Sequence, residues 1–106
     1  MKFYIAGPIT GDPDYKQKFA AAVEIFAALW PDDIALNPAV LPEGMNPGAY
    51  MSICLPMLLM ADSVFLLPGW ETSAGAKIEK ALAEYAGIPV YEFPALCLAE
   101  WLEGSA

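Results

Sequence analysis

Residues 62–79, with the sequence DSVFLLPGWETSAGAKIE, decide the fold of this chain. The apolar run 63–67 predicts a buried strand, Pro68-Gly69 predicts a tight turn, and a helix is expected to follow from about Ala74. A buried strand, a polar loop and a helix in this order are typical of a parallel sheet. Ligands bind such sheets at the carboxyl ends of the strands, where the loop 68–73 would lie.

The start of the expected helix is suited to an anion such as phosphate. Thr72 or Ser73 can cap the helix, and Gly75 would let a ligand approach the backbone closely. The free amides and the positive end of the helix dipole both favour negative charge at this position. Glu79 follows about one and a half turns into the helix and would point its carboxylate into the same crevice.

The rest of the chain repeats the alternation of strand and helix. Further strands are predicted at 2–6, 34–36 and 88–91, and further helices at 15–30, 48–61 and 95–102, with the helix described above running over 74–86. We therefore expect one α/β domain over residues 1–106. It would be a flavodoxin-like or Rossmann-like, doubly wound parallel sheet of order 2-1-3-4 with helices on both faces.

Local signals predict the ends and the faces of these helices. Asp14 is expected to cap the first helix, and Gly87 to end the third in a left-handed conformation. Pro56 would kink the second helix or lie in its first turn. Cys54 and Cys97 are expected to be small core residues rather than metal ligands or a disulfide. The residues of the third helix expected to face the core are Ile78, Ala81, Leu82 and Tyr85.

The strand order 2-1-3-4 places the switch point of the sheet between the first and third strands, flanked by the loops 7–14 and 68–73. Gly7 and Gly11 are either plain turn residues or part of a nest of amides around a phosphate. Trp70 either stacks on a base or packs against the loop 37–47 or a second subunit. The candidate binding residues are Gly7, Pro8, Ile9, Thr10, Gly11, Asp12, Gly69, Trp70, Ser73 and Gly75.

Composition argues against several classes of function. The net charge is −8, with five lysines and neither arginine nor histidine, so no nucleic-acid polymer is expected as a partner. The absence of histidine removes the commonest general base and most zinc sites, and we expect neither a metal nor a cofactor. The chain opens on a strand, and no apolar run reaches the ~20 residues that span a bilayer. A cytoplasmic protein without membrane contact is expected.

The expected helix 48–61 is uncharged and apolar on nearly every side. A helix without a polar face is usually buried on both sides. One side would then pack on the sheet and the other on a second subunit. We therefore expect a homodimer or a higher homo-oligomer through residues 48–61.

Three segments carry a resemblance to a known superfamily. They are Tyr4-Ile5-Ala6-Gly7-Pro8, Leu67-Pro68-Gly69-Trp70, and the pattern Ser73-x-Gly75-Ala76-x-x-Glu79. Together they resemble a small, often phage-borne, DUF4406-like branch of the nucleoside 2-deoxyribosyltransferase superfamily, which includes 2′-deoxynucleoside 5′-phosphate N-hydrolases. The resemblance covers roughly residues 2–91. It implies a nucleoside or nucleotide ligand.

The resemblance also implies roles for individual residues. Glu79 matches the glutamate that attacks the anomeric carbon, and Tyr4 matches the tyrosine that supports it. Ser73 stands where the monophosphate hydrolases carry a phosphate-binding serine and where the transferases tend to carry an aspartate. The implied function is an N-glycosidase-type enzyme that cleaves or transfers the base of a (deoxy)nucleoside 5′-monophosphate.

The chain departs from the superfamily at one position. A second carboxylate usually comes from the helix before the third strand, and the matching residue here is Cys54. A thiol, with an ordinary pKa of ~8.5, is a poor acid near neutral pH. Asp62 lies at the wrong edge of the sheet and is taken as structural. The acids expected at the correct edge are Asp12, Asp14, Glu43 and Glu71, with Glu71 or Asp12 preferred as proton donor to the departing base.

Two alternatives to an enzyme stay open. Cys54 in place of a carboxylate favours a nucleotide-binding or sensing module without turnover. A purely structural dimerising domain is the third possibility. Both alternatives are compatible with the same fold.

Overall fold

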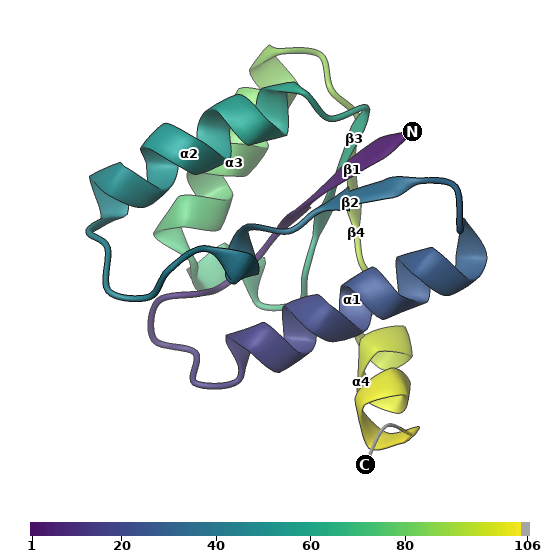
Figure 1. Ribbon diagram of the computed structural model, residues 1–106. Helices are drawn as coiled ribbons and strands as arrows, with labels where there is room; N and C mark the ends of the chain where they lie inside the picture. The colour runs from purple at the N-terminus through teal and green to yellow at the C-terminus, as the bar shows by residue number, and fades with distance from the viewer. Residues whose placement is uncertain (105–106) are drawn as a thin grey trace.

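The computed structural model describes residues 1–104. Within them, four parallel strands form one sheet in the order β2-β1-β3-β4 (Figure 1). The strands are β1 (Lys2–Ala6), β2 (Ile34–Leu36), β3 (Ser63–Leu66) and β4 (Val90–Glu92). Helical crossovers connect them, so the predicted doubly wound α/β fold and its strand order are confirmed.

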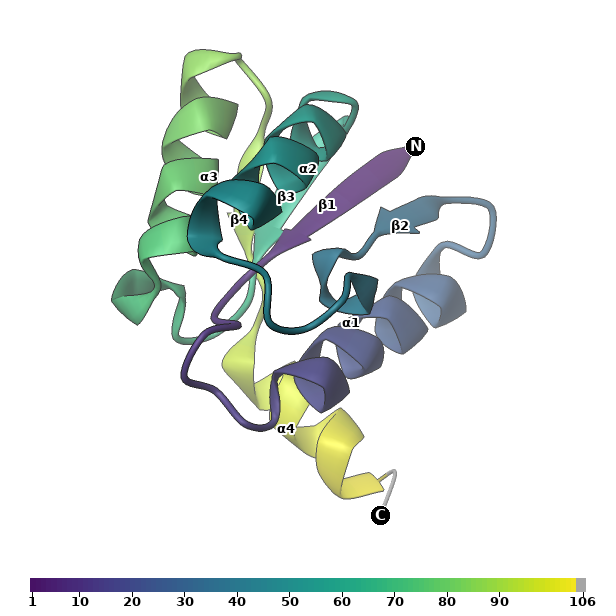
Figure 2. The ribbon, with the colours of Figure 1, turned by 60° about the vertical axis from the view of Figure 1, so that its left-hand side comes forward.

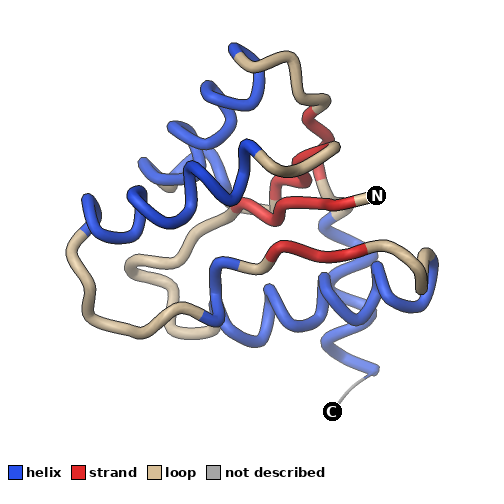
Figure 3. Tube along the Cα trace, turned by 45° about the horizontal axis from the view of Figure 1, so that its top comes forward, coloured by secondary structure: helices blue, strands red, loops and turns tan. Residues whose placement is uncertain are grey.

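Helices cover both faces of the sheet. The helices α2 (Pro47–Leu59) and α3 (Ala74–Tyr85) pack on one face, whereas α1 (Tyr15–Leu29) and α4 (Ala95–Gly104) pack on the other (Figure 2). Figure 3 shows the strands enclosed between these two helical layers. Two short 3₁₀ turns, η1 (Pro38–Val40) and η2 (Trp70–Thr72), lie in the loops that follow β2 and β3.

The central strand β1 contributes to both cores, because successive side chains of a strand point to opposite faces. Phe3 and Ile5 pack towards α1, and the ring centroids of Phe3 and Phe26 lie 5.0 Å apart. Tyr4 and Ala6 point towards α2 and α3 and are completely buried. A buried tyrosine hydroxyl needs a hydrogen-bond partner, so the face that holds Tyr4 must provide one.

Two predicted helix ends are confirmed and a third is wrong. The Ser73 hydroxyl oxygen caps α3 by accepting a bond of 3.2 Å from the Ala76 amide. Gly87 follows α3 with a φ of 75°, the expected left-handed conformation. The Asp14 side chain makes no capping bond at α1. Instead the Asp14 amide donates to Asp12 Oδ1 at 2.9 Å, so the turn before α1 closes on Asp12.

The prediction of the core face of α3 is also wrong. Of the four residues expected there, only Leu82 packs against the core. Ile78, Ala81 and Tyr85 are exposed, Tyr85 by 92%. The residues of α3 that are buried are Ala76, Glu79 and Ala83. Two alanines let α3 approach the sheet closely, and the Glu79 carboxyl finds a donor there, so a polar contact determines which face of the helix is inside.

Three smaller expectations can be compared with the structure. Because α2 begins at Pro47, Pro56 lies inside the helix and not in its first turn. Cys54 is buried as predicted, whereas Cys97 is exposed, since α4 packs on α1 through the neighbouring Leu98. Neither cysteine forms a disulfide within residues 1–104. Asp62 accepts a bond of 2.7 Å from the Lys2 amide, which fits its expected structural role.

We predict that Gly7→Ala destabilises the protein by about 1–3 kcal/mol, the usual cost of overpacking. A Cβ atom at Gly7 would lie 2.9 Å from the Cβ of Leu67, which is attached directly to the backbone and cannot turn aside. Urea unfolding measures the change. Gly48→Ala in the first turn of α2 is the control, because its Cβ would meet no atom closer than 3.4 Å. Equal urea midpoints for the two variants would contradict this packing argument.

Candidate functional site

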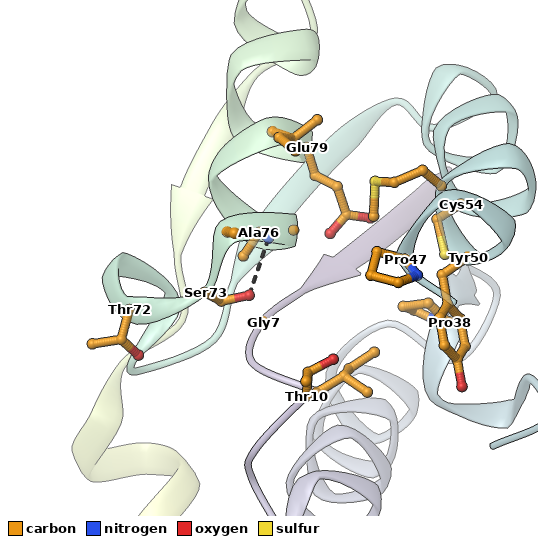
Figure 4. Close-up of a pocket in the computed structure, with 15 residues that line it drawn as sticks. Gly7, Thr10, Pro38, Pro47, Tyr50, Cys54, Thr72, Ser73, Ala76 and Glu79 are labelled. Atoms are coloured by element: carbon orange, nitrogen blue, oxygen red, sulfur yellow. Dashed lines mark hydrogen bonds between the residues drawn. The ribbon is translucent and has the colours of Figure 1, made fainter. Parts of the chain in front are cut away.

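A cavity of about 380 Å³ opens at the carboxyl edge of the sheet, between α2 and α3 (Figure 4). The loop after β1 forms one wall with Gly7, Ile9 and Thr10. The first half of α2 and the first half of α3 form two further walls. Its volume falls within the range of small-molecule sites in proteins. The cavity lies beside the switch point between β1 and β3, where the sequence places a ligand.

Glu79 lies at the bottom of this cavity with 5% of its surface exposed. The hydroxyl of Tyr4 donates a hydrogen bond to Glu79 Oε2. The second oxygen, Oε1, accepts no bond from the described residues and is not sealed inside the protein, so it faces the cavity. One carboxylate oxygen is therefore held in place while the other is open to a ligand.

Burial changes the pKa of each titratable group around Glu79. It raises the pKa of Glu79 to about 7, although the bond from Tyr4 acts in the opposite direction. Burial and then the negative charge of Glu79 raise the pKa of Tyr4, whose hydroxyl therefore stays protonated as a donor. Burial also raises the pKa of the Cys54 thiol, which lines the same cavity and stays neutral at pH 7. Near neutral pH, Glu79 is thus divided between its two protonation states.

The start of α3 forms the mouth of the cavity. Ser73, Ala74 and Gly75 line it, and the Ser73 hydroxyl is already engaged as the helix cap (Figure 4). A side chain at Gly75 would come within 3.5 Å of the Met51 methyl group, so glycine keeps the passage between α2 and α3 open. The amides of this first turn and the helix dipole can receive an anion.

The five lysines stand away from this cavity. Lys16 pairs with Glu43 at 3.0 Å and Lys18 with Asp12 at 2.8 Å. Because the chain has no arginine or histidine, no cationic side chain of residues 1–104 lines the cavity. Among the described residues there is also no group of three or more possible metal ligands. A phosphate in the cavity would therefore be bound without a cationic side chain, by amides, the helix dipole and the hydroxyls of Thr10, Thr72 and Ser73.

A second hollow of about 550 Å³ adjoins the cavity. Ile9, Thr10 and Tyr50 line both, so the two spaces are neighbours. Of the predicted binding residues, Gly11 and Asp12 line this second hollow and not the cavity. The hydrogen bond to Lys18 holds the pKa of Asp12 below its usual range. Asp12 is therefore an ionised acceptor rather than a proton donor.

The remaining predicted residues lie outside both spaces. Pro8 and Gly69 lie close to each other, because a Cβ atom placed on Gly69 would be 3.4 Å from Pro8 Cγ. The Trp70 indole donates to Glu92 at 2.9 Å, and the Lys80 Nζ lies 5.6 Å from its ring centroid. Glu71 beside it is exposed and lines neither space. Trp70 thus packs against residues of β4 and α3, whereas the expected packing partner was the loop 37–47 or a second subunit.

Several cavity residues were not singled out by sequence reasoning. They are Pro38, Pro47, Tyr50, Met51, Ala74, Ala76 and Ile78. Three of them, Pro47, Tyr50 and Met51, belong to α2, which is apolar on nearly every side, so its sequence does not indicate which side faces the cavity. Asn46 was a sequence signal for the start of α2. Its side chain caps the helix by accepting a hydrogen bond of 2.8 Å from the Ala49 amide.

Comparison with family models shows a match of residues 1–92 to the family Domain of unknown function (DUF4406). The chain belongs to this family. The DUF4406 match runs from β1 to β4, so it contains every residue that lines the cavity and leaves out α4. Comparisons with curated proteins and with solved structures gave no match. None of the described helices of this DUF4406 protein is long and apolar enough to cross a membrane.

We predict that Glu79 makes the stability of this DUF4406 protein depend on pH. Folding raises the pKa of Glu79 from 4.5 to about 7, so its protonated form favours the folded state. This stabilisation is complete below pH 4.5 and is lost as the pH rises through about 7. Between pH 5 and 8 the wild type should lose up to about 3 kcal/mol relative to Glu79→Gln, which cannot ionise. Urea unfolding at both pH values tests this, and equal losses for the two proteins would contradict it.

Proposed function

We propose that this protein is an N-glycosidase that cleaves or transfers the base of a nucleoside or nucleoside 5′-monophosphate. The observation that carries the proposal is Glu79, a buried carboxylate with one oxygen held by Tyr4 and the other facing a ligand-sized cavity. The resemblance of the sequence to nucleoside 2-deoxyribosyltransferases supports the same role for Glu79. The burial of Glu79 argues against the alternative that it is a solvent-exposed residue of α3 without a function.

The reaction needs Glu79 as a nucleophile. In its ionised form, Oε1 attacks the anomeric carbon while the bond to the base breaks through an oxocarbenium-like transition state. Tyr4 keeps its proton and holds Oε2, so it orients the carboxylate throughout. The glycosyl ester then passes to water or to a second base.

The 5′ end of the substrate would lie at the start of α3. Ser73 and Gly75 line the cavity there, and the helix dipole favours a phosphate. Since no lysine reaches the cavity, we expect a 5′-phosphate to increase affinity only modestly over the free nucleoside. The same lack of cations supports our proposal that nucleic-acid polymers are not ligands.

A binding or sensing module without turnover is the second candidate. Cys54 favours it, because a neutral thiol faces the cavity where a second acid would assist catalysis. Under this alternative an intact nucleotide would raise the melting temperature, and no base would be released over hours.

We predict that purified protein releases free base from one or more nucleosides or nucleoside monophosphates, and that Glu79→Gln lowers the rate by more than about 10³-fold, as expected for loss of a nucleophile. Chromatography measures the released base. The rate of the wild type should rise with pH through about 7 as Glu79 ionises. Tyr4→Phe should shift this rise to higher pH, because the lost hydrogen bond normally lowers the pKa of Glu79. An unshifted profile would show that Tyr4 does not act on Glu79.

We further propose a homodimer through the outer surface of α2. This helix carries no charged residue, yet Ile53, Leu59 and the adjacent Met60 are 41%, 51% and 59% exposed. In a chain of net charge −8, an uncharged apolar surface is where two copies can meet without repulsion. A second copy is therefore the partner that fits this surface.

We predict that Leu59→Lys converts the dimer to a monomer, because each subunit would bury a charge at the interface. Analytical ultracentrifugation measures the mass. Leu96→Lys is the matched control, since Leu96 is 71% exposed but lies on α4, on the opposite side of the sheet. A monomeric wild type, or a dimer that Leu59→Lys leaves intact, would contradict this interface.

A further inference from the structure

The cavity contains a nucleophile but, in the part of the chain that the structure describes, no side chain suited to protonate a departing base. Within residues 1–104, Glu79 is the only carboxyl that lines it, and an ionised Glu79 has no proton to give. The Tyr4 hydroxyl is committed to Glu79, and the Tyr50 hydroxyl donates to the carbonyl oxygen of Pro42 at 2.7 Å. Cys54 lines the cavity, but burial raises the pKa of its thiol, which makes it a poor proton donor. A neutral base must gain a proton as it leaves, and the site therefore gives little assistance to its departure.

The charges around the cavity favour a positive ligand group. The chain carries a net charge of −8 and no lysine lines the cavity, so nothing there balances an ionised Glu79. In a partly dehydrated site, an unbalanced carboxylate attracts a cation much more strongly than it would in water. A ligand with a positive ring near Glu79 would supply the missing charge.

The neighbouring hollow could accommodate such a ring. Tyr50 lines both spaces, and Tyr15 lines the hollow beside it. Tyrosine faces attract organic cations through their ring quadrupoles. The carboxylates of Asp12 and Glu43 lie along the same hollow, each paired with a lysine. A flat cationic ring could therefore contact aromatic side chains while its sugar lies above Glu79.

We propose that the substrate is a nucleoside or nucleotide whose base carries a formal positive charge, of the pyridinium or N-alkylpurinium class. This inference rests on the proposed N-glycosidase function. Glu79 Oε1 forms a bond to the anomeric carbon as the bond from that carbon to the ring nitrogen breaks. The bonding electron pair goes to the base, cancels its positive charge and lets it leave neutral without a proton. Water then cleaves the glycosyl ester, which returns Glu79 as a carboxylate and releases the sugar and one proton to solvent.

Guanosine and 7-methylguanosine form a matched pair of substrates, because one methyl group places the positive charge on the base. Nicotinamide riboside is the pyridinium representative, and the 5′-monophosphates of all three complete the panel. The chromatographic assay follows released base, with Glu79→Gln as the blank for spontaneous cleavage. We expect kcat/KM at least about 10²-fold higher for 7-methylguanosine than for guanosine, the lower range of what a positioned general acid contributes.

A change at Cys54 tests the missing proton donor directly. Cys54→Asp places a carboxyl in the cavity beside Tyr4, where burial and the charge of Glu79 would keep it protonated. In this variant, the ratio of kcat/KM for 7-methylguanosine to that for guanosine should fall by at least about 10-fold relative to the wild type. Cys54→Ser, similar in size but not an acid, is the control and should leave this ratio unchanged. Melting temperatures show whether each variant is folded.

The substrate pair is measured on the wild type, so the outcome does not depend on any variant folding. Guanosine cleaved as fast as 7-methylguanosine would overturn this inference while leaving the N-glycosidase function standing. Release of base from none of the six compounds, with neutral deoxynucleosides cleaved instead, would also overturn the inference alone. No release from any nucleoside or nucleotide would overturn both.

Discussion

The hydrogen bond from Tyr4 to Glu79 is the interaction on which the rest of the site depends. It joins the central strand β1 to helix α3 across residues 75 positions apart in the chain. Without it, the buried hydroxyl of Tyr4 and the buried carboxyl of Glu79 would each lack a partner, and each would cost the full penalty of desolvation. With it, α3 turns its only buried acid towards the sheet and exposes Ile78 and Tyr85 instead.

This arrangement leaves apolar surface of α3 exposed in exchange for a buried polar contact. An α3 rotated to bury its apolar stripe would remove more hydrophobic surface from water, but Glu79 would then lie in solvent with an ordinary pKa. The observed rotation raises that pKa to about 7 and leaves one carboxylate oxygen facing the cavity. Proteins commonly depart from local rules of this kind at functional sites.

The fold was predictable from the sequence because its signals are local. Apolar runs, turn residues and the caps at Ser73 and Gly87 each determine one element, and the rules of parallel sheets then leave few ways to order the strands. Residues were harder to place where contacts between distant parts of the chain determine their positions. The spacing of the apolar residues Ile78 and Tyr85 predicted the wrong face of α3, because a pattern of hydrophobic residues takes no account of a buried hydrogen bond. Likewise, Trp70 and Glu71 were expected at the crevice from their place in a loop, but the 3₁₀ turn η2 directs them away from the cavity.

The position of Trp70 has a consequence for spectroscopy. Its indole is bonded to Glu92 and lies under Lys80, while its carbonyl oxygen accepts a bond of 3.0 Å from the amide of Ser73, a residue of the cavity mouth. Trp30 and Trp101, the two other tryptophans, pack on the opposite side of the sheet. Among the described residues, the side of the sheet that holds the cavity therefore carries one tryptophan, one backbone hydrogen bond away from the place where a ligand would enter.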